Sequence, residues 1–240
     1  MTTGAYTYGL PVAVVLSMSA PQDVFVRGYL KGEPNTLYFD QRIDANVLKQ
    51  NGNKARLNMP ISPEFLSIDI YGENNMPAGA KLYDIALENI ESKQLFLSPA
   101  DQEYLDCAEW LAQNCRALPY NTYKRGNVVF DYVNQIIDSQ DGPLTTPARV
   151  DHETGLVEVA GMYIKEYSVP MIVFVMMHER THAEKDTVDE SECDINAANV
   201  CLRRGYSKLE IIYAGTKILP DTQEGRYRLD RLVNYVQNWS

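Results

Sequence analysis

The residues best suited to chemistry lie in a short His-Glu-Arg-Thr-His segment, in which His178 and His182 flank Glu179. The chain has only three histidines, and at this composition the spacing arises by chance on the order of once in several hundred sequences. On a helix, positions i and i+4 share one face, so both imidazoles can reach one metal ion. Glu179 projects to the side of that face, where its carboxylate can take a proton from metal-bound water. The segment therefore predicts a zinc site with Glu179 as the catalytic base.

The segment before these histidines is strongly apolar. Residues 171–177 contain only Met, Ile, Val and Phe, which predicts a buried helix. Met171, Phe174 and Val175 fall on the same helix face as the histidines. The competing interpretation is a pair of hydrogen-bonded core histidines. Zinc is favoured because it also explains Glu179 and the acidic residues that follow.

A zinc ion with one position left for water needs a third protein ligand. The metzincin pattern fails, because Lys185 and Val188 stand where its glycine and third histidine would be. A thermolysin-like spacing also fails, because residues 201–203 are Cys, Leu and Arg. Glu190 and Asp194 form a Glu-x-x-x-Asp pair that is separated from the second histidine by only seven residues.

Helical phase distinguishes Glu190 from its neighbour Glu192. At about 100° per residue, Glu190 and Asp194 share a stripe whose other members are small and apolar. These members are Ala197 and Cys201, whereas the stripe of Glu192 holds Asn196, Asn199 and Arg203. The first stripe should face inward, so Glu190 is the predicted third ligand. Asp194 should lie one turn deeper and accept a hydrogen bond from the far nitrogen of a ligand histidine.

Glu190 has one competing role. Thr187 and Glu190 also have the spacing of a capping box, in which Glu190 would bond back to the Thr187 amide. A cap alone would explain neither the histidines nor Asp194, so zinc is preferred. Glu210 is a more distant reserve ligand.

The four cysteines are expected to be buried free thiols. None forms a Cys-x-x-Cys pair, and each lies in a segment predicted to be helical. Buried free thiols are favoured over disulfide bridges or metal ligands, and they suit a reducing interior. The four residues are Cys107, Cys115, Cys193 and Cys201.

Composition limits the function classes. The net charge of −10 argues against nucleic-acid binding through a basic patch, and Arg226, Arg228 and Arg231 are expected on the solvated side of a terminal helix. No segment reaches the length of a membrane span. The apolar run Gly9–Ala20 has no preceding Lys or Arg, so it predicts a first β-strand and not a signal peptide.

The pattern along the chain predicts an α+β protein with two domains. Residues 1–75 show short strands with Gly, Pro and Asn turns, typical of a small antiparallel sandwich or barrel with a binding or assembly role. Residues 72–79 resemble a linker. Residues 80–240 should form a compact α+β domain with a strand near 128–137 and two more, 148–150 and 156–164, around a turn. The expected helices span 98–115, 169–185, 188–204, 208–218 and 224–238.

HERTH (178–182) followed by ESECD (190–194) resembles the compact gluzincins, zinc metallopeptidases whose second motif closely follows the first. The resemblance implies one Zn²⁺ ion on His178, His182 and Glu190. It also implies Glu179 as general base and acid and Asp194 as the residue that orients a histidine. The implied reaction is peptide-bond hydrolysis by zinc-activated water.

A narrower resemblance covers residues 146–185 and 190–210. These runs are similar to zincin-like virion proteins of crAss-like tailed bacteriophages. That resemblance implies a ring, neck or tail component, located in the virion as a homo-oligomer among other virion proteins. The alternative is a free-standing, cytoplasmic zinc endopeptidase without a structural role.

Catalysis would also require a donor that stabilises the transition state, and no residue type identifies it. The candidates are His152, Tyr163, Tyr206 and Tyr213, although His152 is better explained as a surface turn residue. A peptide substrate is expected to lie antiparallel along an edge strand near residues 156–164. Glu179 separates the two function classes, because a purely structural zinc site has no use for its carboxylate.

Overall fold

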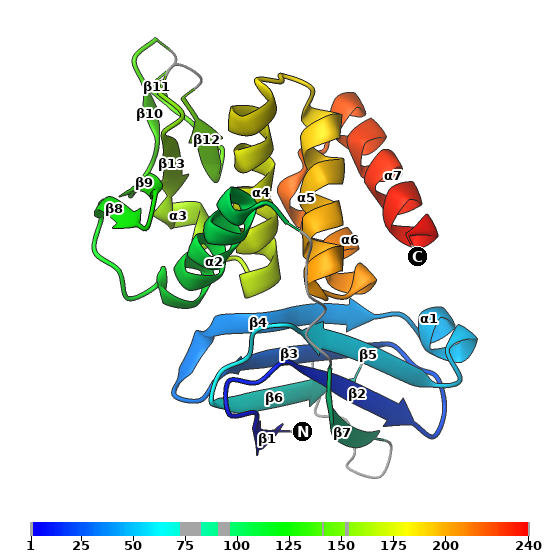
Figure 1. The fold of residues 1–240 in the computed structure, drawn as a ribbon. Coiled ribbons are helices and arrows are strands. Elements are labelled where there is room, and N and C mark those ends of the chain that lie inside the picture. The colour runs from blue at the N-terminus through cyan, green and yellow to red at the C-terminus, as the bar shows by residue number, and fades with distance from the viewer. Residues whose placement is uncertain (1, 73–82, 91–96, 141, 152–153, 240) are drawn as a thin grey trace.

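The computed structural model describes residues 2–72, 83–90, 97–140, 142–151 and 154–239. Its N-terminal part is a sandwich of two antiparallel sheets (Figure 1), with strand orders β1-β6-β3-β4 and β5-β2-β7. The first sheet consists of β1 (Thr2–Tyr6), β3 (Val24–Leu30), β4 (Glu33–Ile43) and β6 (Phe65–Tyr71). The second consists of β2 (Val12–Met18), β5 (Lys54–Met59) and β7 (Tyr83–Asn89), and the short helix α1 (Ala45–Gln50) precedes β5. The antiparallel sandwich predicted for the N-terminal part is therefore present.

The β-rich part extends further along the chain than its expected end at residue 75. Strand β7 pairs with β2 from Val12↔Asn89 to Met18↔Tyr83 and so completes the second sheet. A strand following the expected linker was missed because short alternating segments carry weak signals without their partner strand. The expected linker, residues 72–79, lies outside the described residues except for Gly72.

The C-terminal part combines helices with a small mixed sheet of order β12-β13-β9-β8. Its strands are β8 (Asn121–Arg125), β9 (Val128–Val133), β12 (Ala148–Val150) and β13 (Val157–Ala160), and β10 (Ile137–Asp138) and β11 (Gly142–Pro143) form a separate pair. The helices are α2 (Pro99–Asn114), α3 (Gly161–Ile164), α4 (Val169–Lys185), α5 (Glu190–Arg204), α6 (Lys208–Ile218) and α7 (Gln223–Asn238). These helix bounds confirm the five predicted helices to within about two residues.

The predicted strand 156–164 is wrong in two respects. It ends at Ala160, and Gly161–Ile164 forms helix α3. It is also internal, because β13 lies between β12 and β9, so the edge strands are β12 and β8. The sequence alone could not separate the two strands, because pairing with β9, which precedes both of them, decides which is enclosed.

Helix α4 forms the centre of the C-terminal part. All residues from Val169 to Glu179 are buried, as the apolar run predicts, and α2, α5, α6, β12 and β4 pack around it. Buried apolar side chains of both parts belong to one continuous cluster, with β4 at the boundary between sandwich and helices (Figure 1). Among the described residues, no helix combines the length and apolar character needed to cross a bilayer.

Candidate metal centre

Helix α4 presents His178 and His182 on one face, as their spacing predicts. Their Nε2 atoms are 3.0 Å apart, and both side chains are buried. The histidines lie one turn apart near the C-terminal end of the helix, which ends at Asp186 in a left-handed conformation. This turn reverses the chain, so that α5 runs back beside α4.

Glu190 is the first residue of α5 and reaches both histidines. Its Oε2 lies 3.2 Å from His178 Nε2, and its Oε1 lies 3.5 Å from His182 Nε2. The capping box considered for this residue does not form, because Asp189 caps α5 by accepting a hydrogen bond from the Glu192 amide. Glu192 points outward and pairs with Lys185, as the stripe analysis predicts. Glu190 is thus positioned by the helix start to face the histidines.

The far nitrogens of both rings meet oxygen acceptors. His178 Nδ1 lies 3.0 Å from the Asp194 carboxylate, and His182 Nδ1 lies 2.7 Å from the Thr187 carbonyl oxygen. Since both oxygens accept hydrogen bonds, each Nδ1 would carry the hydrogen when the ring is neutral, as metal binding requires. Both Nε2 atoms then direct lone pairs toward each other and toward the Glu190 carboxylate. A cation at this point would satisfy all three groups, so the donor set fits a metal ion.

The pKa shifts describe the same electrostatics. Burial alone would lower the pKa of His178, but its hydrogen bonds to Asp194 and Glu190 raise it to about 9. The hydrogen bond from His178 lowers the pKa of Glu190. Burial opposes ionisation of Asp194, yet the hydrogen bonds from His178 and Arg228 lower its pKa below the ordinary value. The cluster therefore attracts positive charge.

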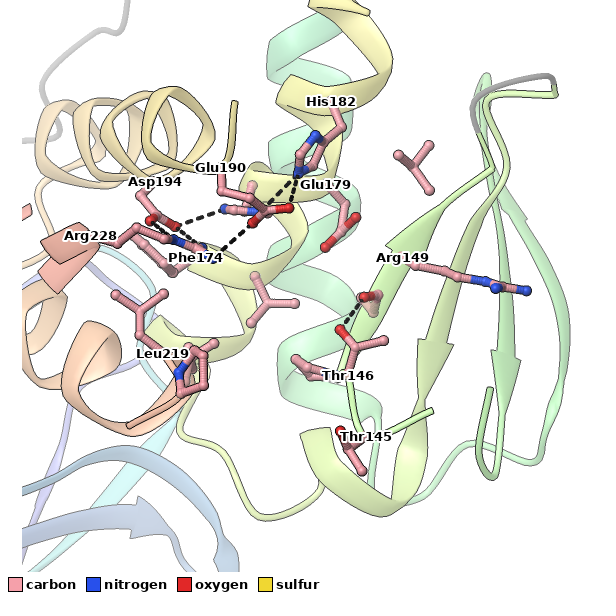
Figure 2. A pocket seen from close by; sticks show the side chains of 17 residues that line it. Thr145, Thr146, Arg149, Phe174, Glu179, His182, Glu190, Asp194, Leu219 and Arg228 are labelled. Carbon is pink, nitrogen blue, oxygen red and sulfur yellow. Dashed lines mark hydrogen bonds and ion pairs between the residues drawn. The ribbon is translucent and has the colours of Figure 1, made fainter. Parts of the chain in front are cut away.

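Arg228 of α7 belongs to this centre, which corrects its expected place on a solvated helix face. Its Nε and Nη2 atoms donate to the two Asp194 oxygens at 2.8 and 3.0 Å, and its Nη1 lies 3.0 Å from Glu190 Oε2 (Figure 2). The Arg228 side chain is only 13% exposed. Its neighbour Arg226 does lie in solvent, where it pairs with Asp221. The difference follows from helical phase, because positions two apart lie on opposite sides of α7.

Cys193 is, after Arg228, a second residue that the sequence did not assign to the centre, and its sulfur could bind a metal ion. One nitrogen of each histidine and the Cys193 sulfur all lie within 4.8 Å of one another, a group that could hold a metal ion. Cys193 is one turn from Glu190 on α5, and that spacing is the signal by which it could have been found. Burial, followed by the Glu190 and Asp194 charges, raises the pKa of its thiol to about 12. All four cysteines are free and buried, as predicted.

The centre lies in the wall of a cleft of about 420 Å³. Residues 145–150, which include edge strand β12, form one side, and residues 218–220 with Arg228 lie on the other (Figure 2). Glu179 lines the cleft together with both histidines and is itself buried. Burial raises the pKa of Glu179, although the nearby histidines act in the opposite direction. A backbone hydrogen bond with Val150 connects this carboxylate to β12.

The three tyrosines considered as transition-state donors do not meet the centre. Tyr163 donates to the Leu144 carbonyl oxygen, and Tyr206 is buried beside Glu109. Tyr213 borders a different cavity, so none of the three tyrosines is among the residues lining the cleft. His152 lies outside the described residues.

The reserve ligand Glu210 also has another role. It completes the capping box of α6 with Ser207, and it is not among the residues that line the cleft.

Comparisons with protein-family models, with curated proteins and with solved structures gave no match. The structure itself shows an α+β chain in which two histidines and neighbouring donor side chains converge at the wall of a cleft.

Proposed function

We propose that this chain is a zinc-dependent peptidase, with one Zn²⁺ ion on His178, His182 and Glu190. The observation that carries the proposal is the meeting of two imidazole Nε2 atoms and a carboxylate within 3.0 to 3.5 Å, beside a cleft that Glu179 also lines. Two nitrogen ligands and one carboxylate are the set found in zinc peptidases that keep a fourth position for water or substrate. The gluzincin resemblance of the two motifs supports the same assignment.

The residues around the proposed zinc ion have distinct parts in the proposed reaction. A bound zinc ion supplies a Lewis acid that makes a water molecule nucleophilic near neutral pH. Glu179 would accept a proton from the attacking water on its carboxylate and return it to the departing amine, so that the peptide C–N bond breaks after the new C–O bond has formed. The hydrogen bond with Val150 holds Glu179 toward the cleft. Asp194 and the Thr187 carbonyl keep the two imidazoles in the tautomer that a metal requires.

A peptide substrate is proposed to extend along β12. This strand is one of the two edges of its sheet, and its residues line the cleft that contains Glu179. An extended peptide can add to such an edge through main-chain hydrogen bonds. The substrate therefore follows Ala148–Val150 and not the enclosed strand β13.

Metal analysis and peptide hydrolysis test the proposal together. Purified wild type and Glu179→Gln should both contain one zinc ion per chain, while hydrolysis of a casein-derived peptide mixture should fall by about 10²–10⁴-fold in the variant. Equal hydrolysis rates would exclude Glu179 as the base. Protein without zinc, whose stability is unchanged by Glu190→Ala, would exclude the metal site.

Cys193 favours a second candidate, in which zinc serves only to clamp α4 to α5. Four protein ligands close a zinc site, and closed sites are structural. Cobalt distinguishes the two, since a thiolate ligand gives Co²⁺ an intense near-ultraviolet charge-transfer band. The peptidase proposal expects a spectrum without this band, unchanged in Cys193→Ser and in the control Cys201→Ser. A band lost only in Cys193→Ser would establish the clamp.

The resemblance to virion proteins supports a ring, neck or tail component as the setting of this site, and this role stays a prediction. Such a component should form a homo-oligomer. Sedimentation velocity of the full chain tests it, and a monomer over the whole accessible concentration range would contradict a self-assembling ring.

A further inference from the structure

The C-terminal helix α7 contributes one cation to a centre built mainly by α4 and α5. Arg228 reaches the carboxylates of Glu190 and Asp194 from the side opposite β12 (Figure 2). All three guanidinium nitrogens have a partner among these two residues. The bidentate contact with Asp194 is the geometry in which arginine recognises a carboxylate most specifically.

The two carboxylates that Arg228 holds act on the same imidazole from opposite ends. Asp194 meets Nδ1 of His178 at 3.0 Å, and Glu190 meets Nε2 of the same ring at 3.2 Å. Asp194 is only 2% exposed, so its charge needs compensation inside the protein. Glu190 is 42% exposed and would otherwise be free to swing into solvent. One guanidinium therefore restrains both the ligand carboxylate and the carboxylate that orients the ligand ring.

We infer that Arg228 is a positioning residue of the metal centre, through which α7 holds Glu190 and Asp194 in the arrangement that receives the metal ion. The inference rests on the proposed zinc site. Arg228 is not proposed to contact the substrate. Its effect on metal binding is exerted through the carboxylates of Glu190 and Asp194. Removal of such groups around a metal site commonly weakens metal binding about 10- to 100-fold.

A simple charge effect would have the opposite sign. A cation beside the centre repels Zn²⁺, so its loss should tighten binding if charge alone mattered. Positioning instead predicts weaker binding when the guanidinium is lost. Arg228→Lys further distinguishes the charge effect from positioning, because lysine keeps the positive charge but lacks the planar fork that spans both carboxylate oxygens.

The experiment measures zinc affinity by competition with a chromogenic chelator for the full-length wild type, Arg228→Met and Arg228→Lys. Both variants should bind zinc about 10- to 100-fold more weakly, with the lysine variant well below wild type. Arg204→Met is the matched control, since Arg204 makes a similar bidentate contact with Glu109 away from the centre. It should lower the melting temperature of the zinc-free protein without changing zinc affinity.

Unchanged or tighter zinc binding in Arg228→Met, or wild-type affinity in Arg228→Lys, would overturn the inference while leaving the zinc site intact. Absence of zinc binding by the wild type would instead refute the proposed function. If the methionine variant does not fold, Arg228→Gln replaces it with the same expectation, because glutamine is neutral and also lacks the fork. Circular dichroism of the zinc-free proteins verifies folding in each case.

Discussion

The two parts of the molecule bury different kinds of polar group. Among the described residues, the buried polar side chains of the sandwich are neutral: Thr7, Thr36, Gln41 and Ser62. The helical part also buries neutral hydroxyls, but in addition it buries ionisable groups: Glu109, His178, Glu179, His182, Asp194 and Glu210. A buried charge is costly unless a partner compensates it. The comparison teaches that the helical part accepts costly burial of ionisable groups, four of which, His178, Glu179, His182 and Asp194, lie at the candidate metal centre.

Each buried acid of the helical part is compensated differently. Glu109 has the bidentate partner Arg204, and Asp194 has Arg228 together with His178. Among the described residues, Glu210 is bonded by the hydroxyl and amide of Ser207, and its Oε1 has no hydrogen-bond partner there. Glu210 is therefore the least compensated of these three acids.

The largest effect on stability is expected in the sandwich. Leu57 is fully buried in the core, so Leu57→Ala should lower the free energy of unfolding by about 2–5 kcal/mol through lost burial and the cavity it leaves. Urea denaturation measures this change. The zinc affinity of the folded Leu57→Ala variant should remain at the wild-type value. A loss of zinc binding in this variant would contradict the expectation that the sandwich core does not affect the zinc site.

The next effect concerns the metal centre. Glu190→Ala should weaken zinc binding by at least about 100-fold, because it removes a ligand and not only a supporting group. Glu192→Ala is the matched control, since it lies two residues away on the exposed face and pairs with Lys185. Competition with a chelator measures the zinc affinities of the two variants. Equal affinities for the two variants would contradict the assignment made from helical phase and from the contacts.

The smallest effect concerns Glu210. Burial raises its pKa to about 8 from the ordinary 4.5, so between these values the folded protein holds a proton that the unfolded chain has released. Stability conferred by this group therefore falls as pH rises from about 4.5 to 8. Glu210→Gln should remove that loss, so that its stability relative to wild type is greater at pH 8 than at pH 5.

Thermal denaturation at the two pH values measures the Glu210 effect. Glu64→Gln, at an exposed position of the sandwich, is the control and should show no such dependence. A Glu210→Gln variant that parallels the wild type across this range would show that Glu210 is ionised in the folded protein.

Much of the centre could be predicted from sequence, because local helix geometry determines it. The i, i+4 spacing was sufficient to place both histidines on one face, and the stripe analysis placed Glu190 and Asp194, and not Glu192, beside them. The apolar run before His178 predicted the buried helix α4. These features depend on residues a few positions apart, so the 3.6-residue period relates sequence directly to position.

Only the tertiary structure decided which distant segments complete the centre. Arg228 lies 34 positions beyond Asp194, and nothing in its local pattern distinguishes it from a solvated arginine. The edge position of β12 depends on the pairing of β13 with β9, and the second sheet of the sandwich depends on the pairing of β7 with β2. Cys193 joins the histidines because the turn at Asp186 returns α5 along α4. Sequence periodicity thus determined which face each helix buries, whereas packing between elements determined what that face meets, because such contacts depend on chain reversals that have no period.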